Sequence, residues 1–268
     1  IDMLGVDPRR FGAYTGRRYT VCKNEETYRN VFTIHYPDEE RADARPAKTS
    51  AVYEKLSQMG AVWGQRYGWE RANWFAPPGV PRKDAWSFRR SNYFQHVGDE
   101  CRRMREAVGV IDLTPFTKHE VSGPGAEGWL DSLVANKVPV KPGRIALCHA
   151  LTKNGGIRSE FTITKLAANR FYVVSAGAGE RYDSDYLHRM LPGDRSVELR
   201  NVTTSRGTFV VAGPNARAVL AQLTDAPLAN ANFPWLSGQV IDVGFATDVY
   251  ALRVNFIGEL GWELHFPI

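Results

Sequence analysis

Hydrophobic and polar residues follow one pattern twice in the later two thirds of the chain. Val121-Ser122-Gly123-Pro124 leads into a helical stretch over 125–134, and Val211-Ala212-Gly213-Pro214 leads into one over 215–223. In both copies a strand ends at Gly, and Pro takes an early helix position where its missing N–H costs nothing. The two Gly-Pro pairs lie 90 residues apart, since 213 − 123 = 90. Each copy therefore predicts a strand followed by a helix.

Each predicted helix is followed by segments in which apolar and polar residues alternate as they do in β-strands. The first pair covers 161–165 and 171–175, and the second pair covers 250–256 and 262–266. The repeat predicts two βαββ-type halves with mainly antiparallel sheets, so the fold class is α+β rather than a doubly wound parallel sheet. A further helix at about 181–191 is expected to pack between the halves.

The first 85 residues show few periodic patterns. One helix is predicted over 50–59, and Gly60 is expected to end it. The cluster Pro77-Pro78-Gly79-Val80-Pro81 is typical of a linker or an extended loop. We therefore predict two domains, 1–85 and 86–268.

Composition and charge add few constraints. With 268 residues, 43% of them hydrophobic, the chain can bury a substantial core. The net charge of +5 is spread along the sequence, which suits an anionic ligand but also an ordinary basic protein. No basic stripe interleaved with aromatics indicates nucleic-acid binding, and no apolar run approaches the roughly 20 residues that span a bilayer. We expect neither a nucleic acid nor a membrane as a partner.

The cysteines and histidines show no metal-binding pattern. Cys22, Cys101 and Cys148 are widely spaced, which argues against a disulfide framework and favours a reducing compartment. The histidines are expected to be structural or exposed, and they are His35, His96, His119, His149, His188 and His265. No metal site is expected. Because the chain starts with Ile1 and stops within a predicted strand, we expect it to be a piece of a longer protein.

Two glycine-bearing turns each carry a carboxylate. Glu160 follows Asn154-Gly155-Gly156, and Glu259 lies between Gly258 and Gly261. Glycine leaves room for a planar ligand to approach the backbone. A carboxylate can accept the adjacent N–H donors on the 2-amino-4-oxo edge of a pterin, while the rest of the ring needs an apolar slot. The alternatives are a solvent-facing strand residue for Glu160 and a simple turn acid for Glu259.

These two stretches resemble the folate-binding aminomethyltransferase family, which comprises the T-protein of the glycine cleavage system and its relatives. Segments 67–76, 94–98 and 110–118 resemble the second half of dimethylglycine and sarcosine dehydrogenases and oxidases. In those enzymes a flavin-dependent amine oxidase half is fused to a T-protein-type half. The resemblance implies that 1–85 is the end of the flavin oxidoreductase central region and its linker, and that 86–268 is a C-terminally truncated folate-binding domain.

The resemblance also implies roles for individual residues. Glu259 falls in the family's Gly-Glu-x-Gly-x-Glu pattern and would hold the pterin edge. Glu160 stands where the T-protein family has an aspartate, and it would be the catalytic group that manages protons. The residues that would line the folate slot are Phe116, Leu147, Val174 and Ser175. Leu147 falls where many relatives have tyrosine, and Phe116 fits an ordinary core aromatic equally well.

The implied function is one-carbon transfer. The parent's flavin half would oxidise an N-methyl group of dimethylglycine or sarcosine, and tetrahydrofolate bound here would capture the one-carbon unit as 5,10-methylenetetrahydrofolate. FAD would belong to the missing N-terminal half, because this chain has no Gly-x-Gly-x-x-Gly turn.

Two alternatives to this function stay open. One is a non-catalytic relative resembling the regulatory subunit of pyruvate dehydrogenase phosphatase, and the other is a stand-alone aminomethyltransferase. The tryptophan-rich segment 67–76 disfavours the second, which lacks such a segment. The expected location is cytoplasmic, or the mitochondrial matrix in a eukaryote. The N-methyl amine, the choice of oxidase or dehydrogenase and the oligomeric state cannot be predicted from the sequence.

Overall fold

The computed structural model describes residues 7–254, 256 and 258–268. The chain divides into two compact units, Ile1–Arg103 and Met104–Ile268. The boundary at 85/86 stays a prediction from the proline-rich cluster, and the compact units divide later in the chain. Each unit is described by itself below.

The first unit centres on a two-stranded antiparallel sheet. Strand β1 (Ala61–Arg66) pairs with β2 (Trp69–Phe75), and the side chain of Trp74 is 1% exposed against Val62. The helix predicted over 50–59 is confirmed as α2 (Tyr53–Gln58), and Gly60 follows it with φ +98°. The remaining helical elements are η2 (Pro8–Arg10), α1 (Arg17–Arg29) and α3 (Phe94–Glu106), which continues across the division.

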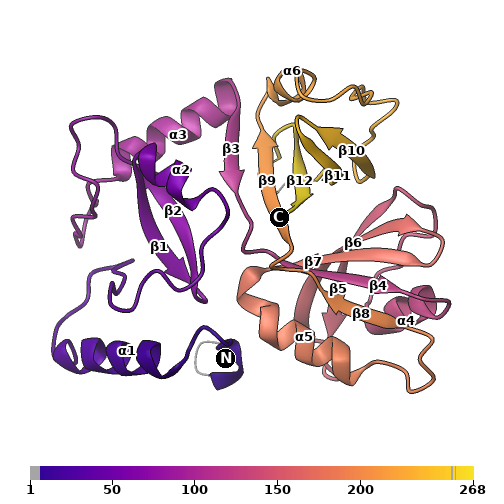
Figure 1. Ribbon diagram of the computed structural model, residues 1–268, viewed down its shortest axis with the longest axis horizontal. Helices are drawn as coiled ribbons and strands as arrows, with labels where there is room; N and C mark the ends of the chain where they lie inside the picture. The colour runs from indigo at the N-terminus through magenta and orange to yellow at the C-terminus, as the bar shows by residue number, and fades with distance from the viewer. Residues whose placement is uncertain (1–6, 255, 257) are drawn as a thin grey trace. The chain divides into compact units, whose positions relative to one another are not determined.

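The second unit consists of two five-stranded sheets in which every neighbouring pair is antiparallel (Figure 1). The first sheet has the order β5-β6-β7-β4-β8, with β4 (Thr117–Ser122), β5 (Ile145–Leu151), β6 (Ile157–Ala167), β7 (Arg170–Ser175) and β8 (Glu198–Asn201). The second has the order β10-β11-β12-β9-β3, with β3 (Gly109–Asp112), β9 (Arg206–Ala212), β10 (Gly238–Val243), β11 (Ala246–Leu252) and β12 (Gly261–Pro267). The predicted α+β class with antiparallel sheets is confirmed.

The two Gly-Pro turns occupy equivalent places in the two halves. Gly123 follows β4 with φ +113° and precedes α4 (Ala126–Leu133), and Gly213 follows β9 with φ +124° and precedes α6 (Ala216–Leu220). A Cβ would lie 2.3 Å from the Ser196 carbonyl oxygen at Gly123, and 2.6 Å from the Ala107 carbonyl oxygen at Gly213. Positive φ and close backbone contact both require glycine. The predicted repeat is confirmed, and each half contains one strand more than expected, β5 or β10.

The fifth strand of each sheet comes from outside its own repeat. Strand β3 precedes the first half in the chain but pairs with β9 of the second sheet. Strand β8 follows the first half and completes the first sheet by pairing with β4. The chain therefore begins the second sheet with β3, completes the first sheet with β4 to β8, and then returns to the second sheet.

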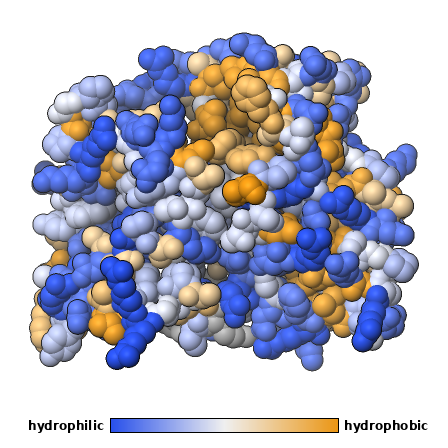
Figure 2. Space-filling view, viewed as in Figure 1, coloured by the Kyte–Doolittle hydropathy of each residue, from blue (hydrophilic) through white to orange (hydrophobic). Residues whose placement is uncertain are grey.

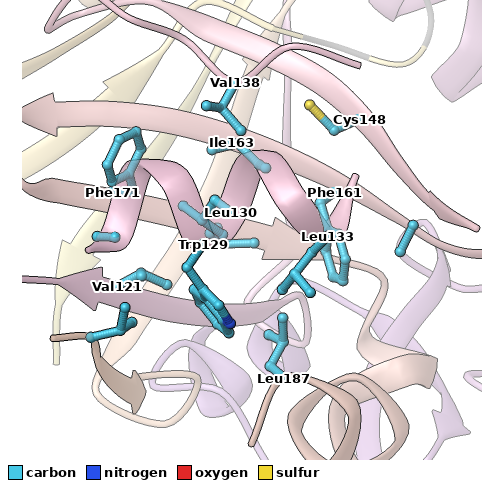
Figure 3. Packing of buried hydrophobic residues seen from close by; sticks show 14 residues of the cluster. Val121, Trp129, Leu130, Leu133, Val138, Cys148, Phe161, Ile163, Phe171 and Leu187 are labelled. Carbon is cyan, nitrogen blue, oxygen red and sulfur yellow. The ribbon is translucent and has the colours of Figure 1, made fainter. Parts of the chain in front are cut away.

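Helix α4 covers the outer face of the first sheet (Figure 3). Its Trp129, Leu130 and Leu133 pack against Phe161 and Ile163 of β6, which explains the apolar positions of both elements.

The prediction that a helix over 181–191 packs between the halves is wrong. The structure has α5 (Glu180–Arg189), and its buried Leu187 joins the same outer cluster as α4. The reason is that Tyr186 and Leu187 pack in that outer apolar cluster, whereas side chains of the sheets themselves pack together between them.

The inner faces of the two sheets meet in a mixed layer of apolar and polar side chains. Ile145, Tyr172 and Val174 of the first sheet pack with Tyr250 and Leu252 of the second. Figure 2 shows hydrophobic side chains gathered in the upper part of the view, over the region where Figure 1 places β3, β9 and α6. Strand β3 is one source of exposed apolar surface, since Val110 is 62% exposed.

Candidate functional site

The inner face of the first sheet changes from buried to open across three adjacent strands. The register pairs Leu147 of β5 with Thr162 of β6, and Thr162 with Val174 of β7, so the three side chains form one row on one face. Val174 is 4% exposed, whereas Leu147 is 45% exposed. An apolar side chain at the open end of a buried row provides a surface against which a flat ring can pack.

Glu160 lies on the same open face and is paired with a histidine. It is two residues before Thr162 on β6, and the register places it opposite His149 of β5. The His149 Nε2 is 3.0 Å from the Glu160 Oε2, and the two side chains are 40% and 60% exposed. The pair therefore places a carboxylate and an imidazole, both open to solvent, next to the row that contains Leu147.

Phe116 connects the buried end of the row to the segment that carries Glu259. Phe116 is half-buried against the cluster that contains Val174 and Val254. Its ring meets the ring of Phe256 edge to face, with centroids 5.9 Å apart. Glu259 is half-buried and lies between Gly258, where φ is +80°, and the start of β12. The glycine turn predicted around Glu259 is present, and it joins β11 to β12.

Ser175 lies on the other face of the first sheet. Because side chains alternate along a strand, Ser175 points away from the side that Val174 faces. Its hydroxyl donates a 2.7 Å hydrogen bond to Asp183 Oδ2 on α5, and the Ser159 hydroxyl donates to Oδ1 of the same carboxylate. Burial raises the pKa of Asp183, and these two hydroxyl donors oppose that rise. Ser175 therefore fixes α5 to the sheet and does not line the open face.

The residues next to Glu160 are held firmly by α5. The Arg158 guanidinium carbon lies 4.3 Å from the centroids of both the Tyr182 and the Tyr186 rings, a double cation–π contact. Together with the hydrogen bond from Ser159 to Asp183, this contact fixes the first residues of strand β6. Glu160 itself is paired with His149, and within the described residues it forms no hydrogen bond or ion pair with α5.

A network of buried polar side chains joins the two sheets. The His265 Nδ1 is 3.0 Å from both the Tyr172 hydroxyl and the Thr208 hydroxyl, and its Nε2 is 3.1 Å from Glu263 Oε2. Burial lowers the pKa of His265, although Glu263 acts in the opposite direction. His265 is 0% exposed and so belongs to the interior. The network fixes one sheet against the other and leaves no room there for a ligand.

The candidate site combines apolar side chains with carboxylates. Leu147, Val174 and Phe116 offer apolar contact, and Glu160 and Glu259 offer carboxylates for N–H donors. Sequence reasoning treated His149 as structural or exposed and missed its pairing with Glu160. The hairpin register between β5 and β6 brings the two residues together, but a register shift between Ala150 and Leu151 hides this pairing in the sequence. Among the described residues, no group of three or more His, Cys, Asp or Glu side chains could hold a metal ion.

The architecture is that of a T-protein. The chain superposes on the crystal structure of the glycine cleavage system aminomethyltransferase T from Bartonella henselae with a TM-score of 0.67, at 24% identity, over 82% of this chain and 54% of that one. Residues 52–268 match the family model described as the GCVT N-terminal domain, and residues 1–50 match the FAD dependent oxidoreductase central domain. The chain belongs to the GCVT N-terminal domain family.

The curated relatives confirm the predicted resemblance. Mitochondrial dimethylglycine dehydrogenase of Rattus norvegicus is 35% identical over 265 residues, which cover 98% of this chain and 31% of that protein. The mitochondrial pyruvate dehydrogenase phosphatase regulatory subunit of Mus musculus is 29% identical over 98% of this chain and 31% of that protein. The chain thus spans about a third of the length of these relatives. Within the described residues, no helix is long and apolar enough to cross a membrane.

Proposed function

We propose that this chain is the folate-binding portion of an FAD-dependent dimethylglycine or sarcosine dehydrogenase-type enzyme. In this role it binds tetrahydrofolate and captures the one-carbon unit from oxidative N-demethylation as 5,10-methylenetetrahydrofolate. The observation that carries the proposal is the exposed Glu160–His149 pair, 3.0 Å apart, on a rigid strand beside the half-open apolar row of Leu147 and Val174.

Each residue of the open face has a distinct part in the proposed reaction. Tetrahydrofolate supplies the N5 and N10 amines that take up the one-carbon unit. Glu160 accepts a proton from the reacting amine, and His149 stabilises the carboxylate and relays the proton to solvent. Glu259 accepts the N–H donors of the pterin edge. Leu147, Val174 and Phe116 exclude water from one side of the ring.

FAD and the amine oxidation belong, in this proposal, to another part of the same polypeptide. The match of residues 1–50 to the FAD dependent oxidoreductase central domain supports this arrangement. Relatives three times as long as this chain, among them the rat dimethylglycine dehydrogenase, have room for such a part. The mitochondrial names of these relatives support the mitochondrial matrix as the location in a eukaryote.

The second candidate function is that of a non-catalytic regulatory subunit. The 29% identity to the mouse pyruvate dehydrogenase phosphatase regulatory subunit over 98% of this chain favours it. Such a protein would use the same fold for contacts with other proteins and would not need the proton relay of Glu160 and His149. Folate binding separates the two candidates.

The test is a calorimetric titration of the chain with a stable reduced folate. We expect saturable binding that is lost in Glu259→Ala and weakened at least about tenfold in Leu147→Asp, because the first removes the acceptor and the second places a charge in the apolar row. Glu198→Ala is the matched control, since Glu198 is an exposed carboxylate on β8, the edge strand of the first sheet opposite β5.

The outcomes are distinct. Binding by the control but not by Glu259→Ala supports the folate site. Unchanged binding in a folded Glu259→Ala removes this residue from the site. Absence of binding in both this chain and the full-length parent overturns the proposal in favour of the regulatory candidate.

A further inference from the structure

The outer face of the second sheet contains a buried hydrogen-bond donor that has no acceptor. Trp262 of β12 is 0% exposed and packs beneath α6, on the side of the sheet opposite to Tyr250 and Leu252. Its indole Nε1 has no hydrogen-bond partner in the part of the chain that the structure describes. A buried unpaired donor costs about 1–3 kcal/mol, so native structures normally supply a partner for it.

Two arginines stand next to this ring. The guanidinium carbon of Arg217 on α6 lies 5.9 Å from the centroid of the Trp262 ring, and that of Arg253, which follows β11, lies 5.7 Å from it. The Arg217 Nε is also buried and has no partner within the described residues. The same small region thus contains two unsatisfied N–H donors and two positive charges.

The protein offers these arginines only neutral acceptors. Arg217 Nη2 donates to Asn230 Oδ1 at 2.5 Å, and Arg253 Nη1 donates to the carbonyl oxygen of Phe233. Within the described ranges, neither arginine forms an ion pair with a carboxylate. Several other arginines of the chain do form such pairs. Burial and the charge of Arg217 both lower the pKa of Arg253. Both guanidinium groups therefore lie beside the same indole ring with no carboxylate among the described residues to balance their charge.

We propose that Arg217, Arg253 and Trp262 form a binding site for a small oxyanion, a phosphate or a carboxylate. Guanidinium groups bind both anions through paired N–H bonds, and an indole N–H can supply one more donor. The anion would neutralise the two charges and satisfy both orphaned donors. This site lies on the opposite face of the second sheet from the proposed folate residues, and it does not depend on the proposed function.

The site also brackets the segment that carries Glu259. Arg253 stands just before this segment and Trp262 just after it, so a bound anion would link the end of β11 to the start of β12. The anion would therefore stabilise the second half of the unit whether or not folate is present.

The test follows the indole N–H signals of the isotopically labelled chain by NMR during separate titrations with inorganic phosphate and with acetate. Trp262→Phe assigns the Trp262 signal. We expect that signal to move to lower field and saturate at millimolar anion, while the other tryptophan signals stay in place. Saturation by phosphate alone identifies a phosphate site, and saturation by both identifies a general oxyanion site.

Two variants and a control complete the test. Arg217→Gln and Arg253→Gln should each weaken anion binding about tenfold, because each removes one charged donor pair. Arg144→Gln, which replaces an exposed arginine just before β5, should leave anion binding unchanged. A Trp262 signal that does not respond to either anion overturns the proposal. An equal response in the Arg217→Gln and Arg144→Gln variants also overturns it, since that would be a general salt effect.

Discussion

The two halves of the second unit share a topology but place a glutamate–histidine pair very differently. In the first half, Glu160 and His149 face each other across an open hairpin with side chains 60% and 40% exposed. In the second half, Glu263 and His265 lie on one strand with side chains 3% and 0% exposed. A solvated pair contributes about 0–1 kcal/mol to stability, whereas a buried pair becomes costly once one partner is removed. The same two residue types therefore serve structure in one half and are available for chemistry in the other.

The largest effect on stability is expected at the two glycines that follow β4 and β9. Gly123→Ala and Gly213→Ala should each lower the free energy of unfolding by about 4 kcal/mol or more, because a Cβ meets a backbone carbonyl oxygen and φ is positive. Urea denaturation measures both. Gly128→Ala is the control, since its Cβ would meet nothing within 4 Å. Similar losses at 123 and 213 sharpen the comparison, and a small loss at either would contradict the equivalence of the two turns.

The buried pair is tested by removing its carboxylate. Glu263→Ala should cost about 3–4 kcal/mol of unfolding free energy, because the His265 Nε2 is left without its 3.1 Å partner in the interior. Thermal and urea unfolding measure this loss. Glu198→Ala, an exposed carboxylate, should change stability little. A cost below about 1 kcal/mol would show that the two halves do not differ in the way proposed.

Acid sensitivity should come from a buried histidine. Burial lowers the pKa of His119 from 6.5 to about 4, and His119 Nε2 is 2.8 Å from the Ser184 hydroxyl. As the pH falls through 6.5, the unfolded chain takes up a proton that the folded chain accepts only near pH 4. Between these values the protein should lose about 3 kcal/mol of unfolding free energy.

The matched variant for this pH dependence is His119→Gln, which cannot titrate but keeps a polar group near Ser184. Its unfolding free energy should vary less between pH 7 and 4 than that of the unchanged protein. Parallel pH profiles for the two proteins would assign the acid sensitivity to other groups.

The smallest effect on stability should come from the open pair. Glu160→Gln should change the unfolding free energy by no more than about 0.5 kcal/mol, because the side chain is 60% exposed. In the full-length parent, the same variant should slow folate-dependent capture of the one-carbon unit by about a hundredfold or more while amine oxidation continues. An unchanged rate of capture would show that Glu160 has no catalytic role and is either a binding residue or an ordinary surface residue.

The sequence predicted the repeated parts of the fold but not the strands that connect them. The Gly-Pro turns and the alternating segments predicted the helices and the strands near 161–175 and 262–266, because those signals are local. Strands β3 and β8 have only four residues each, and their pairing with β9 and β4 is decided by distant partners. No local pattern could have shown that β3 joins the second sheet.

The glycine turns near Glu160 and Glu259 were predictable from the sequence, but the pairing of side chains was not. The turns around Glu160 and Glu259 were visible in the sequence, and alternation alone would have separated Ser175 from Val174. The partner of Glu160 was not visible in the sequence, because a register shift between Ala150 and Leu151 changes which residue stands opposite Glu160. Counting back from the 151–157 pair without this bulge puts Cys148, not His149, opposite Glu160.

The placement of strand β3 in the second sheet also affects the order in which the sheets can be completed. Val110 of β3 pairs with Val211 of β9, 101 residues later in the chain. At about 5–20 residues per second, β3 leaves the ribosome roughly 5–20 s before its partner. Until β9 is made, β3 is an unpaired strand whose Val110 and Ile111 side chains are exposed. Such a strand can pair with other chains and aggregate. We therefore expect chaperones to bind the chain while the first sheet is being completed. The second sheet consequently reaches its full set of strands only after the whole first sheet has been made.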